Sequence, residues 1–136
     1  MIAKVAEFLS GCPYLYGETV NINYLDKTDG AISLGMSQKS VSLKEYSDGG
    51  ALKGEFFILS LCKEFGPSFA ENTRISENCE SIENWVEEQN LKGNLPKLDG
   101  GREVVSIGVS KRFGLVHTNH IAARYEAEIE VIYYNN

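Results

Sequence analysis

The sequence lacks both the long apolar runs of a membrane protein and the basic clusters of a nucleic-acid-binding protein. No stretch approaches the roughly 20 consecutive apolar residues that a membrane span requires. The chain carries 13 Lys and Arg against 19 Asp and Glu, a net charge of −6, and Lys111 with Arg112 is its only adjacent basic pair. Because a protein that grips the nucleic-acid backbone needs a basic face, we expect no adhesive contact with DNA.

Cysteine is scarce, and its spacing excludes two common uses. Cys12, Cys62 and Cys79 are an odd number and form no Cys-x-x-Cys pair, so neither a disulfide framework nor a zinc ribbon is expected. We interpret all three as small buried hydrophobic residues. The first seven residues lack the continuous apolar segment of a signal peptide, which favours a protein made and folded in a cytoplasm, with no membrane partner.

The length of 136 residues and the 43% hydrophobic content are those of one ordinary globular domain. Apolar spacing predicts a helix from Ile2 to about Ser10 and a long helical segment from Ser68 to Asn90. It also predicts strands, with turns at Gly49-Gly50 and Gly100-Gly101. The predicted fold is therefore α+β, with residues 1–136 as a single domain. It consists of a mostly antiparallel sheet of about six strands, on which an N-terminal helix and a central helical segment pack. The six strands are expected at 20–24, 31–36, 41–46, 56–62, 105–111 and 120–134.

Two of these segments have the clearest patterns. The strand Phe56–Cys62 is apolar on both faces, which is typical of a central strand covered on both sides. The central helix places Ile82, Trp85, Val86 and Gln89 on one face, so we expect the only tryptophan to lie in the core. Four carboxylates are expected largely on the opposite, solvated face: Glu80, Glu83, Glu87 and Glu88.

The last strand alternates apolar residues with charged ones. Its charged face holds Glu126, Glu128 and Glu130, three like charges that repel one another. One interpretation is a sheet face open to water, and the other is a negatively charged wall that faces a molecule which must not bind to it.

A search for catalytic chemistry finds no candidate. His117 and His120 lie three residues apart with no neighbouring cysteine or carboxylate to complete a metal site, so a structural or surface role is favoured. The sequence has no nucleophile elbow, no phosphate-binding glycine loop and no dinucleotide fingerprint. We therefore predict no catalytic residue, no cofactor, no metal and no enzymatic activity.

A succession of short segments nevertheless resembles a known family. In order along the chain, the segments are Phe8 to Pro13, Val20 to Leu25, Lys44 to Gly50, Phe56 to Phe65, Trp85 to Asn90, Gly93 to Pro96 and Tyr125 to Tyr134. Their order resembles small proteins encoded in the head-to-tail gene block of phages and prophages of Gram-positive bacteria, known as tail terminators or minor capsid proteins. These segments are turn and core pieces, and none of them is a catalytic signature.

The resemblance implies a structural subunit of a virion or phage-tail-like particle, made in the bacterial cytoplasm. Such a subunit assembles with itself as a ring, expected here to be a homohexamer, on the head-proximal end of the tail tube. It stops tube polymerisation and offers the docking surface for the head–tail connector. The other implied partners are the tail tube protein, a sheath protein if the tail is contractile, and DNA as passing, non-adhesive cargo.

Two groups of residues are candidate contact sites in this interpretation. Asp48, Gly49, Gly50, Phe65 and Phe69 lie in loops that leave the central strand, and they are the candidates for contact with the tube or another partner. The three carboxylates of the last strand are the candidates for lining the lumen of the ring. A head-closure or connector adaptor remains an alternative within the same particle, and a small-molecule-binding α+β domain is an alternative from another class.

Overall fold

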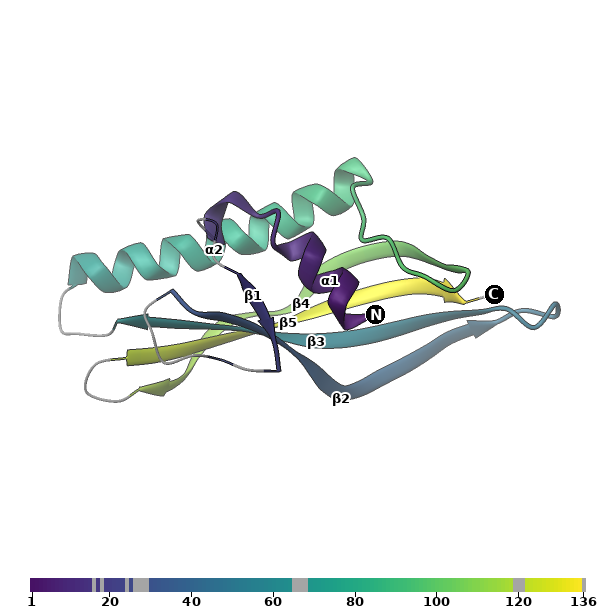
Figure 1. Cartoon of the computed structure of the whole chain (residues 1–136), viewed down its shortest axis with the longest axis horizontal. Coiled ribbons are helices and arrows are strands. Elements are labelled where there is room, and N and C mark those ends of the chain that lie inside the picture. The colour runs from purple at the N-terminus through teal and green to yellow at the C-terminus, as the bar shows by residue number, and fades with distance from the viewer. Residues whose placement is uncertain are drawn as a thin grey trace.

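Five strands form one mixed sheet in the order β1–β2–β3–β5–β4 (Figure 1). The computed structural model describes residues 1–15, 17, 19–23, 25, 30–64, 69–118 and 122–135, the side chains of 64, 69 and 70 excepted. The strands are β1 (Val20–Ile22), β2 (Ile32–Glu45), β3 (Ala51–Glu64), β4 (Arg102–Thr118) and β5 (Ala122–Asn135). Two α-helices, α1 (Ile2–Leu9) and α2 (Phe69–Lys92), and a 3₁₀ turn (Pro13–Leu15) complete the fold.

The predicted α+β class is confirmed, whereas the predicted count of six strands is wrong by one. The segments expected as separate strands at 31–36 and 41–46 are a single strand, β2. Register shifts between Met36 and Ser40, and between Ser42 and Lys44, break the alternation of side chains while pairing with β3 continues through Glu45. The sheet is mixed because β1 pairs with β2 in parallel, and every other pairing is antiparallel.

The central position predicted for the apolar strand is confirmed. β3 lies third of five in the sheet, and it pairs with β2 along one side and with the whole of β5 along the other. Phe57, Leu59 and Leu61 belong to the main core, while Phe56 and Cys62, which point to the opposite face, are also buried. The hairpin predicted around Gly49 joins β2 to β3.

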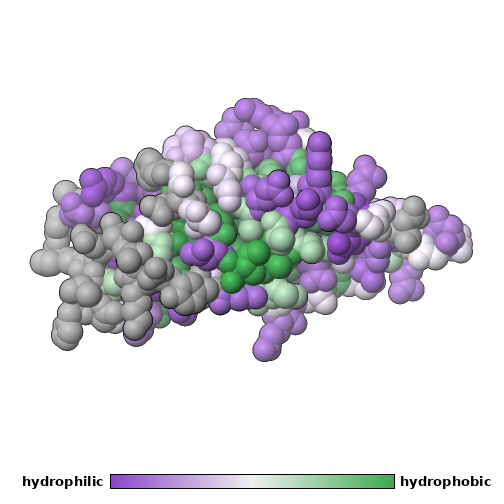
Figure 2. Space-filling model, viewed as in Figure 1, coloured by the Kyte–Doolittle hydropathy of each residue, from purple (hydrophilic) through white to green (hydrophobic). Residues whose placement is uncertain are grey.

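Both helices lie on the same side of the sheet (Figure 1). The core lies between them and the sheet, where Val5 and Leu9 of α1 and Ile82 and Val86 of α2 are fully buried. An apolar patch lies near the centre of the viewed surface, in the region of α1, and the outer face of α2 is hydrophilic (Figure 2). Within the part of the chain that the structure describes, neither helix has the length and apolar character needed to cross a membrane.

The helix and the last two strands show where periodicity succeeds and where it fails. Trp85 was predicted to lie in the core, and it packs partly buried against it. The centroid of its ring lies 5.3 Å from that of the Phe8 ring. Glu83 was expected on the solvated face but is buried. Alternation with Ile107 places Val105 on the inward face of the predicted strand 105–111, but Val105 is exposed, because the register shift between Val104 and Ser106 turns Val104 into the core instead.

All three cysteines are buried, as predicted. The α1, α2 and β5 boundaries also agree with the predicted segments within the described residues. β4 is longer than expected and continues past Lys111 to Thr118.

Candidate functional site

The turn between β2 and β3 is a tightly connected hairpin tip. The N–H of Tyr46 donates to the carbonyl oxygen of Gly50 at 2.8 Å, and the N–H of Gly49 donates to the carbonyl oxygen of Tyr46 at 3.1 Å. The Asp48 carboxylate accepts a further hydrogen bond from the N–H of Gly50 at 3.0 Å. Gly49 has a φ of 91°, a conformation that residues with a side chain rarely adopt. The tip is therefore fixed by its own backbone and by Asp48.

Tyr134, near the end of β5, packs against this tip. Its ring meets the ring of Tyr46 edge-on at 5.5 Å between centroids, and its hydroxyl fills the space in which Gly50 would carry a side chain. Loss of water around the hydroxyl, followed by the negative charge of Asp48, raises the pKa of Tyr134. Asp48, Gly49 and Gly50 thus form one ordered projection at the end of the sheet.

Of the two phenylalanines predicted as partner contacts, Phe69 belongs to a described element. Phe65 lies outside the described residues. Phe69 is the first residue of α2, at the opposite end of β3 from the turn, and its side chain also lies outside the described part. The hairpin tip and the start of α2 therefore lie at opposite ends of β3.

The acidic row of β5 lies on the face of the sheet opposite the main core, and its three members differ. Glu128 is only 5% exposed: it accepts a hydrogen bond from the Ser110 hydroxyl at 2.8 Å and forms an ion pair with Lys39 at 3.6 Å. Glu126 accepts from the Ser60 hydroxyl at 3.2 Å and pairs with Arg124 at 3.2 Å. Glu130 is half-buried, and no ion pair or side-chain hydrogen bond is found for it among the described residues.

These contacts reduce the negative charge of the row. Lys39 and Arg124 offset two of the three carboxylates, and Lys39 also lies 4.3 Å above the centre of the Phe56 ring. Mutual repulsion on β5 is thereby relieved within the subunit. Glu130 is the member of the row that contributes an uncompensated charge.

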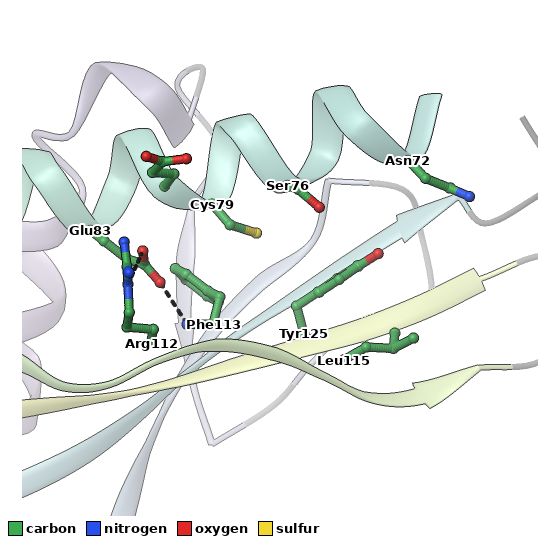
Figure 3. Close-up of a pocket in the computed structure, with 9 residues that line it drawn as sticks. Asn72, Ser76, Cys79, Glu83, Arg112, Phe113, Leu115 and Tyr125 are labelled. Carbon is green, nitrogen blue, oxygen red and sulfur yellow. Dashed lines mark hydrogen bonds and ion pairs between the residues drawn. The ribbon is translucent and has the colours of Figure 1, made fainter. Parts of the chain in front are cut away.

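A groove that the sequence did not indicate runs between the first half of α2 and the strands β4 and β5 (Figure 3). Its volume is about 630 Å³. Ser76 and Cys79 point from the helix toward Phe113 and Tyr125 of the sheet, and the remaining lining residues are Asn72, Glu80, Glu83, Arg112 and Leu115. The groove therefore has an apolar floor and a polar rim.

The polar groups at one end of the groove satisfy each other. The Glu83 carboxylate accepts a hydrogen bond from the backbone N–H of Phe113 at 2.6 Å and one from the Arg112 side chain at 3.2 Å. Burial, with a contribution from the neighbouring Glu83 charge, raises the pKa of the Cys79 thiol to about 11. At neutral pH this cysteine carries its proton, so it is a poor nucleophile.

Three side chains of α2 also cover the outer edge of β4. Besides Glu83, Glu87 accepts from the N–H of Val109 and Asn90 accepts from the N–H of Ile107, each at 3.0 Å. Residues 83, 87 and 90 lie on one side of the helix, at spacings of four and three. These contacts satisfy edge donors that would otherwise pair with another chain.

Comparison with known proteins adds no relative. No family model matches the chain, and no curated protein matches it. The function therefore has to be argued from the chain itself. His117 lies in β4 and is exposed, whereas His120 lies outside the described residues, so their pairing is not described. No group of three or more potential metal-ligating side chains is found within the described ranges.

Two features were not predicted from the sequence: the groove, and the contacts by which side chains of α2 cover the edge of β4. The spacing of Glu83, Glu87 and Asn90 was a signal for these edge contacts, but periodicity alone assigns such residues to solvent. Only the position of the β4 edge beneath the helix shows that backbone donors face them.

Proposed function

We propose that this protein is a structural subunit of a phage or phage-tail-like particle, a tail terminator that caps the head-proximal end of the tail tube as a ring. In this role it stops tube polymerisation and offers the surface to which the head–tail connector docks. The order of segments along the chain motivates the proposal, and the ordered hairpin tip is the structural observation that supports it best.

The hairpin tip suits a contact made by shape. Asp48 and Tyr134 hold it in one conformation, so little conformational entropy remains to be lost when it binds. It lies at the end of two long paired strands, away from both helices (Figure 1). We assign Asp48, Gly49 and Gly50 to the contact with the tube.

The sheet face opposite the helices suits the lumen of such a ring. In the described part of this face, the residues nearest the acidic row include small ones such as Gly108, Ser110 and Gly114. Glu130 supplies a free negative charge and Glu126 a partly compensated one. The cations Lys39 and Arg124 on this face are each paired with a carboxylate of the row, so they offer phosphate little of the free positive charge that binding driven by counterion release requires, and DNA passes without being held.

Co-sedimentation with purified tail tubes tests the proposal. The intact protein is mixed separately with tubes and with the isolated head–tail connector from the same particle. A terminator sediments with the tubes, and deletion of residues 47–50 removes it from the pellet without unfolding it. A protein that binds only the connector is a head-closure adaptor, and a protein that binds neither refutes both assignments.

A further inference from the structure

The two edges of the sheet differ in how they are covered. On β4, backbone N–H groups donate hydrogen bonds to the side chains of Glu83, Glu87 and Asn90. On β2, the neighbour β1 pairs only as far as Leu34, and from Gly35 to Glu45 no described strand or helix side chain pairs with the outer edge. We call residues Gly35–Glu45 the free β2 edge.

The free β2 edge carries three exposed apolar side chains among polar ones. Met36, Val41 and Leu43 are all exposed, and the exposed fraction of Leu43 is 49%. Because Leu43 lies between the two residues of a register shift, it interrupts the regular ladder there. Such an irregular edge is poorly suited to adding another strand. It offers protruding side chains instead.

The groove between α2 and β4 has the complementary character. Its floor includes Phe113 and Tyr125, and Leu115 is 50% exposed beside them. Its rim carries Glu80, an exposed carboxylate with no ion pair among the described residues. The free β2 edge carries the opposite charge. Lys44 lies next to Leu43 there, and its ammonium is 5.1 Å from the centre of the Tyr46 ring.

The two surfaces cannot meet within one copy of the chain. β2 and β4 lie on opposite sides of β3 and β5 in the sheet. Along β3, Lys44 is level with Leu52 and Tyr125 is level with Leu61. At about 3.3 Å per residue, these levels are roughly 30 Å apart.

We propose that the free β2 edge of one copy docks on the α2–β4 groove of a second copy, with Val41 and Leu43 over its apolar floor and Lys44 beside Glu80. The contact joins two different surfaces, so it repeats head to tail and closes into a ring when the rotation allows. The inference rests on the proposed ring and names the surfaces that build it. Closure of the ring strengthens the assembly, because the last contacts form intramolecularly.

Zero-length carbodiimide cross-linking of the intact protein at high concentration tests this contact. The reagent joins a lysine to a carboxylate only where the two touch, and peptide mass spectrometry identifies the joined residues. We expect a link between Lys44 and Glu80, and because of their separation within one chain it must be intermolecular. Mixing isotopically light and heavy protein verifies this through links of mixed mass.

A matched pair of variants gives the test its control. Leu43→Asp places a charge over the groove floor and is expected to lower the yield of the Lys44–Glu80 link about tenfold. Leu91→Asp makes the same change at a residue that is 85% exposed on α2 and outside both surfaces, and it should leave the yield unchanged. Circular dichroism establishes that both variants are folded.

The possible outcomes separate this inference from the proposed function. A Lys44–Glu80 link that is lost in Leu43→Asp supports the contact, whether or not the protein binds tubes. Absence of the link in the wild type, or mixed-mass links only between two β2 edges, such as Lys44 of one copy to Glu45 of another, overturns it. Tube binding without the link leaves the terminator assignment standing and refutes this interface.

Discussion

The Glu83 carboxylate accepts a hydrogen bond from the backbone N–H of Phe113, with 2.6 Å between oxygen and nitrogen. This bond joins the middle of α2 to the outer edge of β4, and Glu83 is buried where it forms. Together with the contacts of Glu87 and Asn90, it fixes the helix over one edge of the sheet and shapes one wall of the groove.

Replacement of Glu83 should therefore destabilise the protein. Glu83→Ala leaves the Phe113 N–H without its acceptor, and we expect the free energy of unfolding to fall by about 1–3 kcal/mol. Glu83→Gln retains an acceptor oxygen and should cost less. Urea denaturation measures both, with Glu80→Ala, an exposed carboxylate one helical turn away, as the control expected to stay within about 0.5 kcal/mol of wild type. Equal losses in Glu83→Ala and Glu80→Ala would contradict a structural role for the bond.

The hairpin tip predicts a coupling between Gly50 and Tyr134. A methyl group at Gly50 meets the Tyr134 hydroxyl, so Gly50→Ala should lower stability by about 1–3 kcal/mol through overpacking. The same substitution in a Tyr134→Ala background should cost much less, since the obstructing ring is gone. A double-mutant cycle from denaturation curves measures the difference. Gly114→Ala is the control, because no atom lies within 4 Å of its added carbon.

Stability should fall at alkaline pH in a way that depends on Cys79. The pKa of its thiol is about 11 in the folded protein against an ordinary value of 9.0, because burial and the Glu83 charge outweigh the opposing effect of Lys63. The unfolded chain therefore loses this proton first as the pH rises. The contribution of Cys79 is complete below about pH 9 and is lost between pH 9 and 11, on the order of 2 kcal/mol.

Urea denaturation at pH 8 and pH 10.5 measures this loss. The wild type should lose more stability between the two pH values than Cys79→Ala does. Tyr133, whose pKa is raised, titrates in both proteins, whereas the Cys79 charge helps to raise the pKa of Tyr125. Both proteins therefore carry Tyr125→Phe in this comparison, which isolates the thiol. An identical loss in the two proteins would show that the thiol ionises alike in the folded and unfolded chains.

Much of the fold follows from apolar periodicity, and its failures have physical causes. Alternation along β5 correctly predicts that Ala127, Ile129, Val131 and Tyr133 are buried on one face. Bulges defeat the same reasoning in β2 and β4, because an extra residue shifts the alternation while the hydrogen bonds to the neighbouring strand continue.

The candidate site was less accessible to sequence reasoning than the fold. The tip at Asp48–Gly50 follows from turn chemistry, which is local. The burial of Glu83 and Glu128 depends on partners distant in the sequence, Phe113 for one and Lys39 for the other. Periodicity contains no information about such partners, so it placed Glu83 on the solvated face of the helix and Glu128 on either a water-exposed sheet face or a negatively charged wall.

The assignment of the acidic row to the lumen makes its own prediction. Lysine at both Glu126 and Glu130 should increase retention of DNA by the assembled ring and slow genome passage, since it supplies the cations that phosphate binds. Glu128 is left unchanged because its burial would make the substitution destabilising. Filter binding at low salt measures retention, and the control is the paired change Glu77→Lys and Glu88→Lys, which alters the same number of charges at exposed positions of α2, on the other side of the sheet. If the double variant retains no more DNA than this control, the row faces away from the DNA path.

Tube growth measures the central claim most directly. Purified tail tube protein is allowed to polymerise with and without this protein, and electron microscopy records tube length and the structure at the tube ends. We predict that added protein forms a ring at one end of each tube and stops elongation there. Tubes that grow to the same length with bare ends would contradict the terminator function.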